Sequence, residues 1–253
     1  MAVAGAPTAL VVLQGIAGLV GLGLGALIAA RSPDPRGRGA MVAVRLALVA
    51  LAASLLFPGT DGVHRWIALG PVQFLPSAVA LPVIVWFAAA RPNGWSGPGA
   101  VILAAALCAA QPDTQAVGAL FAAVAALVLL GRWHPSWLLA LAACLVGGVV
   151  AAFAPALEPV AYVEQVVPLA FEAGPVFGFV AVAGLIGVPA TMLLASGGRF
   201  GPMTAAMAAL WLIFCAASLS GTLPTPVIGF GLSWVLGFGI SLGLVAGRRS
   251  AAA

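Results

Sequence analysis

The sequence predicts an all-α protein: a polytopic bundle of about nine transmembrane helices that forms a single integral membrane domain over residues 1–253. Charged residues make up only 6% of the chain and the mean hydropathy is +1.19. A soluble domain has about a quarter of its residues charged, so this composition excludes one. The apolar runs are also continuous, whereas the strands of a membrane barrel alternate apolar and polar residues, so the spans are predicted to be helices.

Each predicted span is an apolar run that approaches the roughly 20 residues a helix needs to cross a bilayer. Pro and Gly or charged residues separate the runs and mark the connections between them. The nine segments are 8–30, 40–58, 73–90, 98–111, 114–131, 135–155, 172–197, 202–220 and 224–247. Glycines recur at close helical spacing over 15–23 and 229–243, and we expect them to let helix backbones pack closely.

The arginines predict the topology. With nine helices, an N-terminus outside and a C-terminus in the cytoplasm, the positive-inside rule accounts for every arginine but one. The cytoplasmic ones are Arg31, Arg36, Arg38, Arg45, Arg91, Arg132, Arg199, Arg248 and Arg249. Arg65 alone falls outside, on the same side as five acids: Asp61, Asp113, Glu158, Glu164 and Glu172. The net charge of +4 therefore reflects loop arginines and does not indicate a nucleic-acid partner.

Neither a metal nor a cofactor is expected. The cysteines (Cys108, Cys144 and Cys215) lie inside apolar runs and lack the spacing of metal ligands. The two histidines are predicted on opposite sides of the membrane. The N-terminus has no basic region before its first apolar run, which we interpret as a span rather than a cleavable signal.

The densest polar cluster is His64-Arg65-Trp66 on the outer side. An arginine placed against the positive-inside rule is costly, and next to an interfacial tryptophan it would pair with a carboxylate or bind an anionic headgroup. We therefore treat Arg65 as a candidate binding residue, with Trp66 beside it. His64 is either part of the same site or a structural hydrogen-bonding residue.

The five acids predicted on the outer side are interpreted in different ways. Asp61 and Glu158 are interpreted as solvated loop residues. Asp113, which precedes Thr114, either caps a helix or belongs to a site. Glu172 is expected to open the seventh helix, where an acid suits the helix dipole, and to face the bundle. An acid placed within the membrane is a functional candidate by default, so Glu172 is one. Glu164 lies eight residues earlier.

Several of these segments together resemble the SEDS (shape, elongation, division and sporulation) family of membrane proteins. Gly62 to Gly70 resembles that family's G-x-R-W-I-x-L-G segment, and Phe74 to Ser77 follows where the family has F-Q-P-S-E. Gln111 to Asp113 resembles its Q-P-D-x-G-T turn. Glu164 to Gly178 resembles D-F…E-E-L-G-F-x-G, and Gly221 to Pro226 resembles the L-P-x-T-G entry to the last helix. The segments follow the family's order at matching sides of the membrane.

The resemblance implies a glycosyltransferase of the bacterial cytoplasmic membrane that polymerises a polyprenyl-diphosphate-linked glycan, peptidoglycan or a related envelope polymer, at the outer face. It implies a carboxylate base, Glu164 or Glu172, and contact of His64, Arg65, Trp66 and Asp113 with substrate. The partners it implies are membrane lipids, the lipid-linked glycan and a membrane partner such as a transpeptidase.

The chain also departs from the family. Leu75, Ala78 and Leu81 stand where the family has Gln, Glu and Lys, the outer loop is short, and one N-terminal helix is absent. These departures keep a non-catalytic scaffold or partner subunit as the alternative. A small transporter ranks last, because the positions expected at the middle of the membrane are almost all Ala, Leu, Val and Gly.

Overall fold

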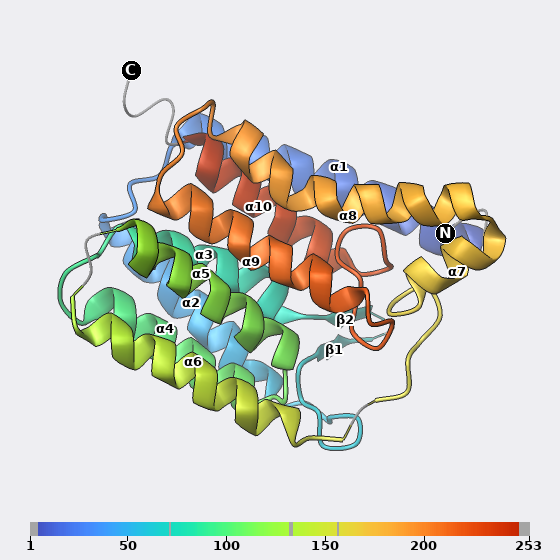
Figure 1. Cartoon of the computed structure of the whole chain (residues 1–253), viewed down its shortest axis with the longest axis horizontal. Coiled ribbons are helices and arrows are strands. Elements are labelled where there is room, and N and C mark those ends of the chain that lie inside the picture. The colour runs from blue at the N-terminus through green and yellow to red at the C-terminus, as the bar shows by residue number, and fades with distance from the viewer. Residues whose placement is uncertain (1–4, 71, 132–133, 156, 248–253) are drawn as a thin grey trace.

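The structure is a computed structural model that describes residues 5–70, 72–131, 134–155 and 157–247. Its helices run roughly along one long axis and pack side by side (Figure 1). In chain order they are α1 (Thr8–Arg31), α2 (Arg38–Ser54), α3 (Pro76–Ala89), α4 (Ser96–Ala110), α5 (Thr114–Leu130), α6 (Ser136–Ala152), α7 (Val166–Ala173), α8 (Pro175–Ala195), α9 (Pro202–Ser218) and α10 (Leu232–Gly247). The predicted all-α class is confirmed, and eight of the nine longer helices begin and end within about four residues of the predicted segments.

The connections differ from the prediction in three places. Two short strands, β1 (Ile67–Leu69) and β2 (Val72–Phe74), form an antiparallel hairpin where a helix was expected to begin. A separate helix, α7, precedes α8, because Gly174 breaks the helix with φ 145° and Pro175 begins the next one. The last helix begins at Leu232, eight residues later than predicted, after an irregular loop.

The two ends of the bundle carry different residues. The β1–β2 hairpin, α7 and the loop before α10 gather at one end, the right-hand side of Figure 1. The connections that contain Arg36, Arg91 and Arg199 lie at the other end. This separation agrees with the predicted sorting of charges. Arg132, Arg248 and Arg249 lie outside the described residues.

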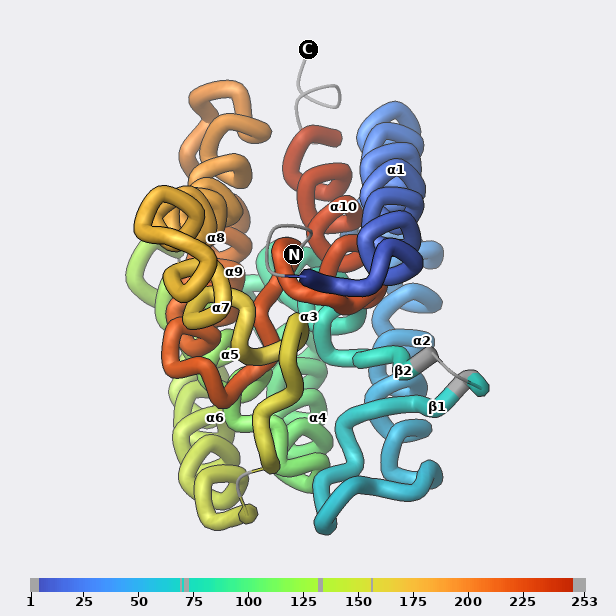
Figure 2. Tube along the Cα trace, turned by 90° about the vertical axis from the view of Figure 1, so that its right-hand side faces the viewer, coloured from blue at the N-terminus to red at the C-terminus, as the bar shows by residue number. Residues whose placement is uncertain are grey.

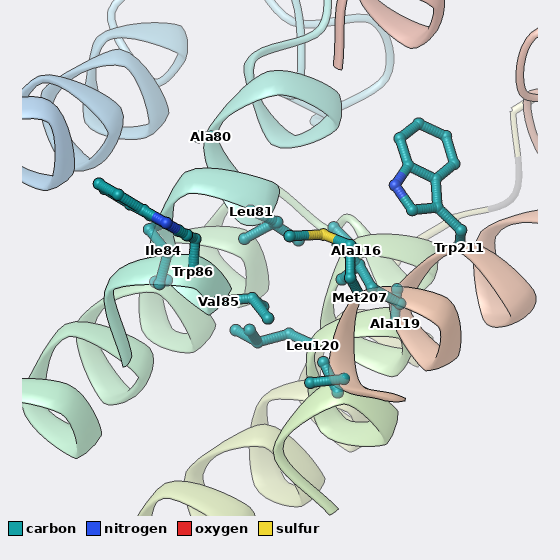
Figure 3. Packing of buried hydrophobic residues seen from close by; sticks show 14 of the residues in the cluster. Ala80, Leu81, Ile84, Val85, Trp86, Ala116, Ala119, Leu120, Met207 and Trp211 are labelled. Carbon is teal, nitrogen blue, oxygen red and sulfur yellow. The ribbon is translucent and has the colours of Figure 1, made fainter. Parts of the chain in front are cut away.

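The core is built around α3, which packs against α2, α4, α5, α9 and α10. Leu81 and Ile84 of α3 are fully buried, as are Leu120 of α5 and Met207 and Trp211 of α9 (Figure 3). By length and composition alone, α1 and α8 could each cross a membrane, and six other helices are apolar segments of 10–17 residues. Leu19 of α1 and Val176 of α8 are 74% and 71% exposed, as expected of helices at the lipid-facing rim.

Glycines allow α1 to pack directly on α10, and Figure 2 shows the two helices side by side. A Cβ on Gly21 would lie 2.7 Å from the carbonyl oxygen of Val235. Gly25 of α1 and Gly239 and Gly243 of α10 are equally close to the facing backbone. Gly21, Gly239 and Gly243 behave as predicted for close helix packing, and Gly25, just beyond the first predicted stretch, adds to the same contact. Gly15 and Gly23 differ from them, because a Cβ there would meet nothing within 4 Å.

Candidate functional site

The loop after α2 is held by local hydrogen bonds that place Arg65. Thr60 and Val63 exchange two backbone hydrogen bonds, 3.1 and 2.9 Å long, around a turn at Asp61 and Gly62, both with positive φ. The Nδ1 atom of His64 lies 3.0 Å from the carbonyl oxygen of Phe57, so His64 ties the loop back to the end of α2. The structure therefore gives His64 a structural contact.

Arg65 is a buried cation with an unpaired donor. Its side chain is 5% exposed, and its guanidinium carbon lies 4.3 Å from the centroid of the Trp66 ring. The Nε atom is fully buried, and its N–H donates to no acceptor within the described part of the chain. Burying an ionised group without a partner is expensive, so a site that keeps one is suited to an anionic ligand.

Arg65 lines a cavity of about 290 Å³ at the outer end of the bundle, which we call the Arg65 cavity. The start of α5 and the end of α6 form two of its sides, and the turn at Thr222 and Leu223 closes a third. Pro112 and Thr114, the two neighbours of Asp113, also line it. Four separate parts of the chain therefore converge around one guanidinium.

Glu164 is another buried charged residue at this end. Its side chain is 6% exposed, and one carboxylate oxygen accepts a 2.9 Å hydrogen bond from the backbone N–H of Val160. Burial raises the pKa of the Glu164 carboxyl, while the Val160 hydrogen bond and the positive charge of Arg65 act in the opposite direction. A carboxylate close to a cation, with a pKa shifted towards neutral, is suited to accept a proton.

The loop before α10 holds the segment that carries Glu164. Thr225 donates a 2.9 Å backbone hydrogen bond to the carbonyl of Val163, and its hydroxyl donates to the carbonyl of Glu164 at 3.2 Å. Phe230 donates to the carbonyl of Tyr162 at 2.7 Å. Gly229 is required here, because a Cβ would come within 3.0 Å of the Val163 carbonyl.

A second cavity, of about 220 Å³, is lined by Trp66, the neighbour of Arg65, and we call it the Trp66 cavity. Trp66, Phe230 and Trp234 supply aromatic walls, while Gln73 and Ser233 supply polar groups. The segment from Leu157 to Val163 runs from the Arg65 cavity to the Trp66 cavity, so Glu164 lies at the end of a segment shared by both.

Asp113 is used by the structure as a helix cap. Its side chain is 3% exposed; one carboxylate oxygen accepts from the backbone N–H of Ala116 at 3.1 Å, and the other accepts from the hydroxyl of Ser77 at 2.8 Å. Both oxygens are thus engaged in joining the start of α5 to α3. Of the two interpretations of Asp113, these contacts favour the capping one.

Asp113→Ala is expected to lower the free energy of unfolding by about 2 kcal/mol, because it removes a cap and leaves the buried N–H and hydroxyl unpaired. Asp113→Asn retains an oxygen for the cap and should lose less. The measurement is thermal unfolding of the purified protein, with Glu158→Ala, at an exposed acid on the same side, as the matched control. Equal stability of Asp113→Ala and the control would contradict the capping role.

Glu172 lies apart from the buried site. It occupies α7 instead of opening the long helix, and its side chain is exposed, so the expectation that it faces the bundle is wrong. Its neighbours Ala170 and Ala173 line an apolar groove of about 340 Å³, which we call the α7–α8 groove; Phe177 and Ile228 line it too.

Two glutamines that the sequence analysis did not single out hold this end together. The amide of Gln14 donates to the carbonyls of Val227 and Gly229, both at 2.8 Å, and its oxygen accepts from the N–H of Gly231. Gln115 donates to the carbonyls of Phe214 and Pro224. A lone amide within an apolar span is itself a signal of a buried partner, and it could have identified Gln14.

Comparison with known proteins gives relatives of one kind. A probable peptidoglycan glycosyltransferase FtsW from Halothiobacillus neapolitanus is 32% identical over 165 residues, which cover 59% of this chain and 39% of that relative. The match therefore spans about two fifths of the curated relative's length. No family model matches the chain.

Solved structures share the fold. The rod shape determining protein RodA from Thermus thermophilus matches with a TM-score of 0.66 and 20% identity over 98% of this chain and 90% of its own. A chain from a structure described as the coordination of polymerization and crosslinking by a peptidoglycan synthase complex matches with a TM-score of 0.63 and 21% identity over 94% of this chain and 90% of its own. The bundle thus has the fold of RodA over nearly its whole length.

Proposed function

We propose that the chain is a divergent, shortened relative of the SEDS proteins and a glycosyltransferase acting on a polyprenyl-diphosphate-linked glycan. Its similarity to an FtsW protein over part of the chain and its RodA fold support this proposal. The glycan would be peptidoglycan or a related envelope polymer, extended at the outer face of the bacterial cytoplasmic membrane. The observation that carries the proposal is the buried guanidinium of Arg65, which lines a cavity, has an Nε without a partner among the described residues, and interacts electrostatically with the buried carboxylate of Glu164.

Arg65 is proposed to hold the diphosphate. A guanidinium presents several N–H donors in a plane and binds phosphate oxygens at two points, with charge assistance. As the bond to the diphosphate breaks, negative charge grows on the leaving oxygen, and a cation already fixed in a cavity stabilises that charge without having to reorganise.

Glu164 is proposed to be the base. It accepts the proton of the acceptor sugar's hydroxyl, whose oxygen forms a bond to the anomeric carbon of the donor sugar. The bond from that carbon to the diphosphate oxygen breaks, and the diphosphate leaves with the bonding electrons. Since Glu172 is exposed on α7, we assign it no part in proton transfer, and it serves here as the comparison residue.

The α7–α8 groove suits the lipid part of such a substrate. It is apolar, about 340 Å³ in volume, and open beside the segment that carries Glu164. A polyprenyl chain bound there would leave its diphosphate at the same end of the bundle as Arg65. A membrane partner such as a transpeptidase is also proposed, since a chain with this fold comes from a structure of a peptidoglycan synthase complex.

The test is polymerisation of a fluorescent lipid-linked disaccharide by the purified protein, alone and with a transpeptidase partner. Glu164→Gln is expected to lower the rate at least 100-fold, because the amide cannot accept the proton. Glu172→Gln should remain within a few-fold of wild type. Failure of the wild-type protein to form polymer under both conditions, or equal rates for wild type and Glu164→Gln, would refute the proposed function.

The protonation of Glu164 determines how activity and stability should change with pH. Activity should rise with pH as Glu164 loses its proton, and because burial raises its pKa, the rise should lie above the usual range of a glutamate. Since the folded-state pKa is raised, wild type should lose stability relative to Glu164→Gln as the pH rises through that value.

A further inference from the structure

We propose that the Trp66 cavity is a binding subsite for one pyranose ring of the glycan. This inference rests on the proposed function and adds to it the place where a sugar is recognised. The volume of the cavity is about 220 Å³, which is enough for a single sugar ring and too little for the full disaccharide. The subsite would therefore hold one sugar unit of the glycan. Concave sites with aromatic walls and a few placed polar groups are where small ligands bind in proteins.

The aromatic walls match the chemistry of a sugar ring. A pyranose presents C–H bonds on one face, and these pack on the electron-rich faces of aromatic rings. Trp66 comes from the loop before β1, and Phe230 and Trp234 come from the segment that begins α10; the three side chains meet at this cavity. Trp234 is held by edge-on packing against Phe214 and Trp211, with ring centroids 4.8 and 6.2 Å away, so this wall is rigid before any ligand arrives.

The Trp66 ring is also held in place by its neighbour Arg65. The guanidinium of Arg65 lies over the indole at 4.3 Å, which fixes the ring. Arg65 itself does not line the Trp66 cavity, and the remaining surface of the indole does. The neighbouring residues Arg65 and Trp66 thus line different cavities: Arg65 lines the one proposed for the diphosphate, and Trp66 lines the one proposed for a sugar.

Two polar groups in the cavity have hydrogen-bonding capacity to spare. The hydroxyl of Ser233 accepts from the backbone N–H of Leu75 at 2.8 Å, and within the described ranges no acceptor takes its hydrogen. The amide of Gln73 is exposed, and no hydrogen bond to it is found among the described residues. A donor on one side and an amide on the other suit the hydroxyl and acetamido groups of a sugar.

The experiment measures binding without turnover. Purified full-length protein is titrated with N-acetylglucosamine and followed by saturation-transfer NMR, in a detergent that has no sugar headgroup. Wild type should bind the sugar. Trp66→Leu should weaken binding at least tenfold and Gln73→Ala about threefold or more, because the exposed glutamine contributes only hydrogen bonds.

The controls use the same residue types outside the cavity. Trp95→Leu, at an exposed tryptophan in the connection between α3 and α4, and Gln165→Ala, beside α7, should bind as wild type does. No binding by wild type, or equal binding by Trp66→Leu and Trp95→Leu, would overturn the subsite. Binding of the isoprenoid geraniol in place of the sugar, lost in Trp66→Leu, would also overturn it and assign the cavity to lipid.

Failure of the subsite and failure of the proposed function give different results. Sugar binding that depends on Trp66, in a protein that forms no polymer, would support the subsite and refute the enzyme. Polymer formation by Trp66→Leu with unchanged rate and KM would support the enzyme and refute the subsite.

Discussion

Arg65→Ala is expected to lower the rate of polymerisation of the lipid-linked disaccharide at least 100-fold while leaving the protein as stable as wild type, or more so. The two halves of this result have one cause. The Arg65 side chain is 5% exposed, and its Nε finds no partner within the described residues. Removing that N–H from water therefore costs free energy in the folded state that no hydrogen bond offsets. Removing the guanidinium should therefore relieve the folded state and deprive the transition state of its main cation.

A loss of this size follows from the position of the charge. Removing one preorganised donor from an anion site in an enzyme costs about 10²–10³ in rate, and a whole guanidinium supplies more than one donor. Arg65→Lys keeps the charge but not the planar pair of donors or the packing on Trp66, so it should recover only part of the rate.

The matched control is Arg38→Ala, at an exposed arginine at the start of α2. Polymerisation and thermal stability are measured for all three variants and wild type in the same detergent. If Arg65→Ala polymerises as fast as Arg38→Ala, Arg65 does not contact the reacting diphosphate. If it instead unfolds well below wild type, the guanidinium has a structural role.

The sequence could identify Arg65 because a membrane imposes a strong rule on arginine. Nine of ten arginines fit the positive-inside rule, and the exception stands out without any knowledge of the fold. The same rule placed Glu164 on the outer side. What it could not show is that the two residues are buried close together, since the hydrogen bonds of Thr225 and Phe230 that fix the segment join parts of the chain more than 60 residues apart.

Local signals with two meanings were harder to resolve. Asp113 before Thr114 fits a cap and a site equally well, and only the hydrogen bonds to Ala116 and Ser77 show that both oxygens are engaged. The apolar neighbours Phe171 and Ala173 predict that Glu172 opens a long helix and faces the bundle. The break at Gly174 turns α7 into a separate helix, and the side chain is exposed as a result.

The hairpin before α3 was missed for a different reason. Its strands are three residues long and lead directly into the apolar sequence of α3, which also suits a helix. Short apolar runs do not distinguish helix from strand by periodicity alone. The glycine-rich segments, by contrast, were interpreted correctly as packing surfaces, but the sequence could not tell which glycines face a helix and which face lipid.

That distinction leads to the largest expected effect on stability. Gly239→Leu is expected to destabilise the protein by about 3 kcal/mol or more, because any Cβ at Gly239 would overlap the backbone of Gly21 on α1. A backbone carbonyl cannot rotate away as a side chain can, so α1 and α10 must separate along their whole contact. Gly25 and Gly243 repeat the close approach one turn on, so the separation would propagate.

The control lies on the same pair of helices. At Gly23 of α1 a Cβ would meet nothing within 4 Å, so Gly23→Leu should be neutral or slightly stabilising, since leucine favours a helix by about 0.8 kcal/mol over glycine. Thermal unfolding of both variants, followed by size-exclusion chromatography in detergent, should give changes of opposite sign. Similar losses in the two variants would mean that any leucine in these helices is disruptive, and that the α1–α10 contact is not held by glycine. Because Gln14 of α1 also holds the loop that orders Glu164, Gly239→Leu should lower polymerisation as well, in proportion to the folded protein that remains.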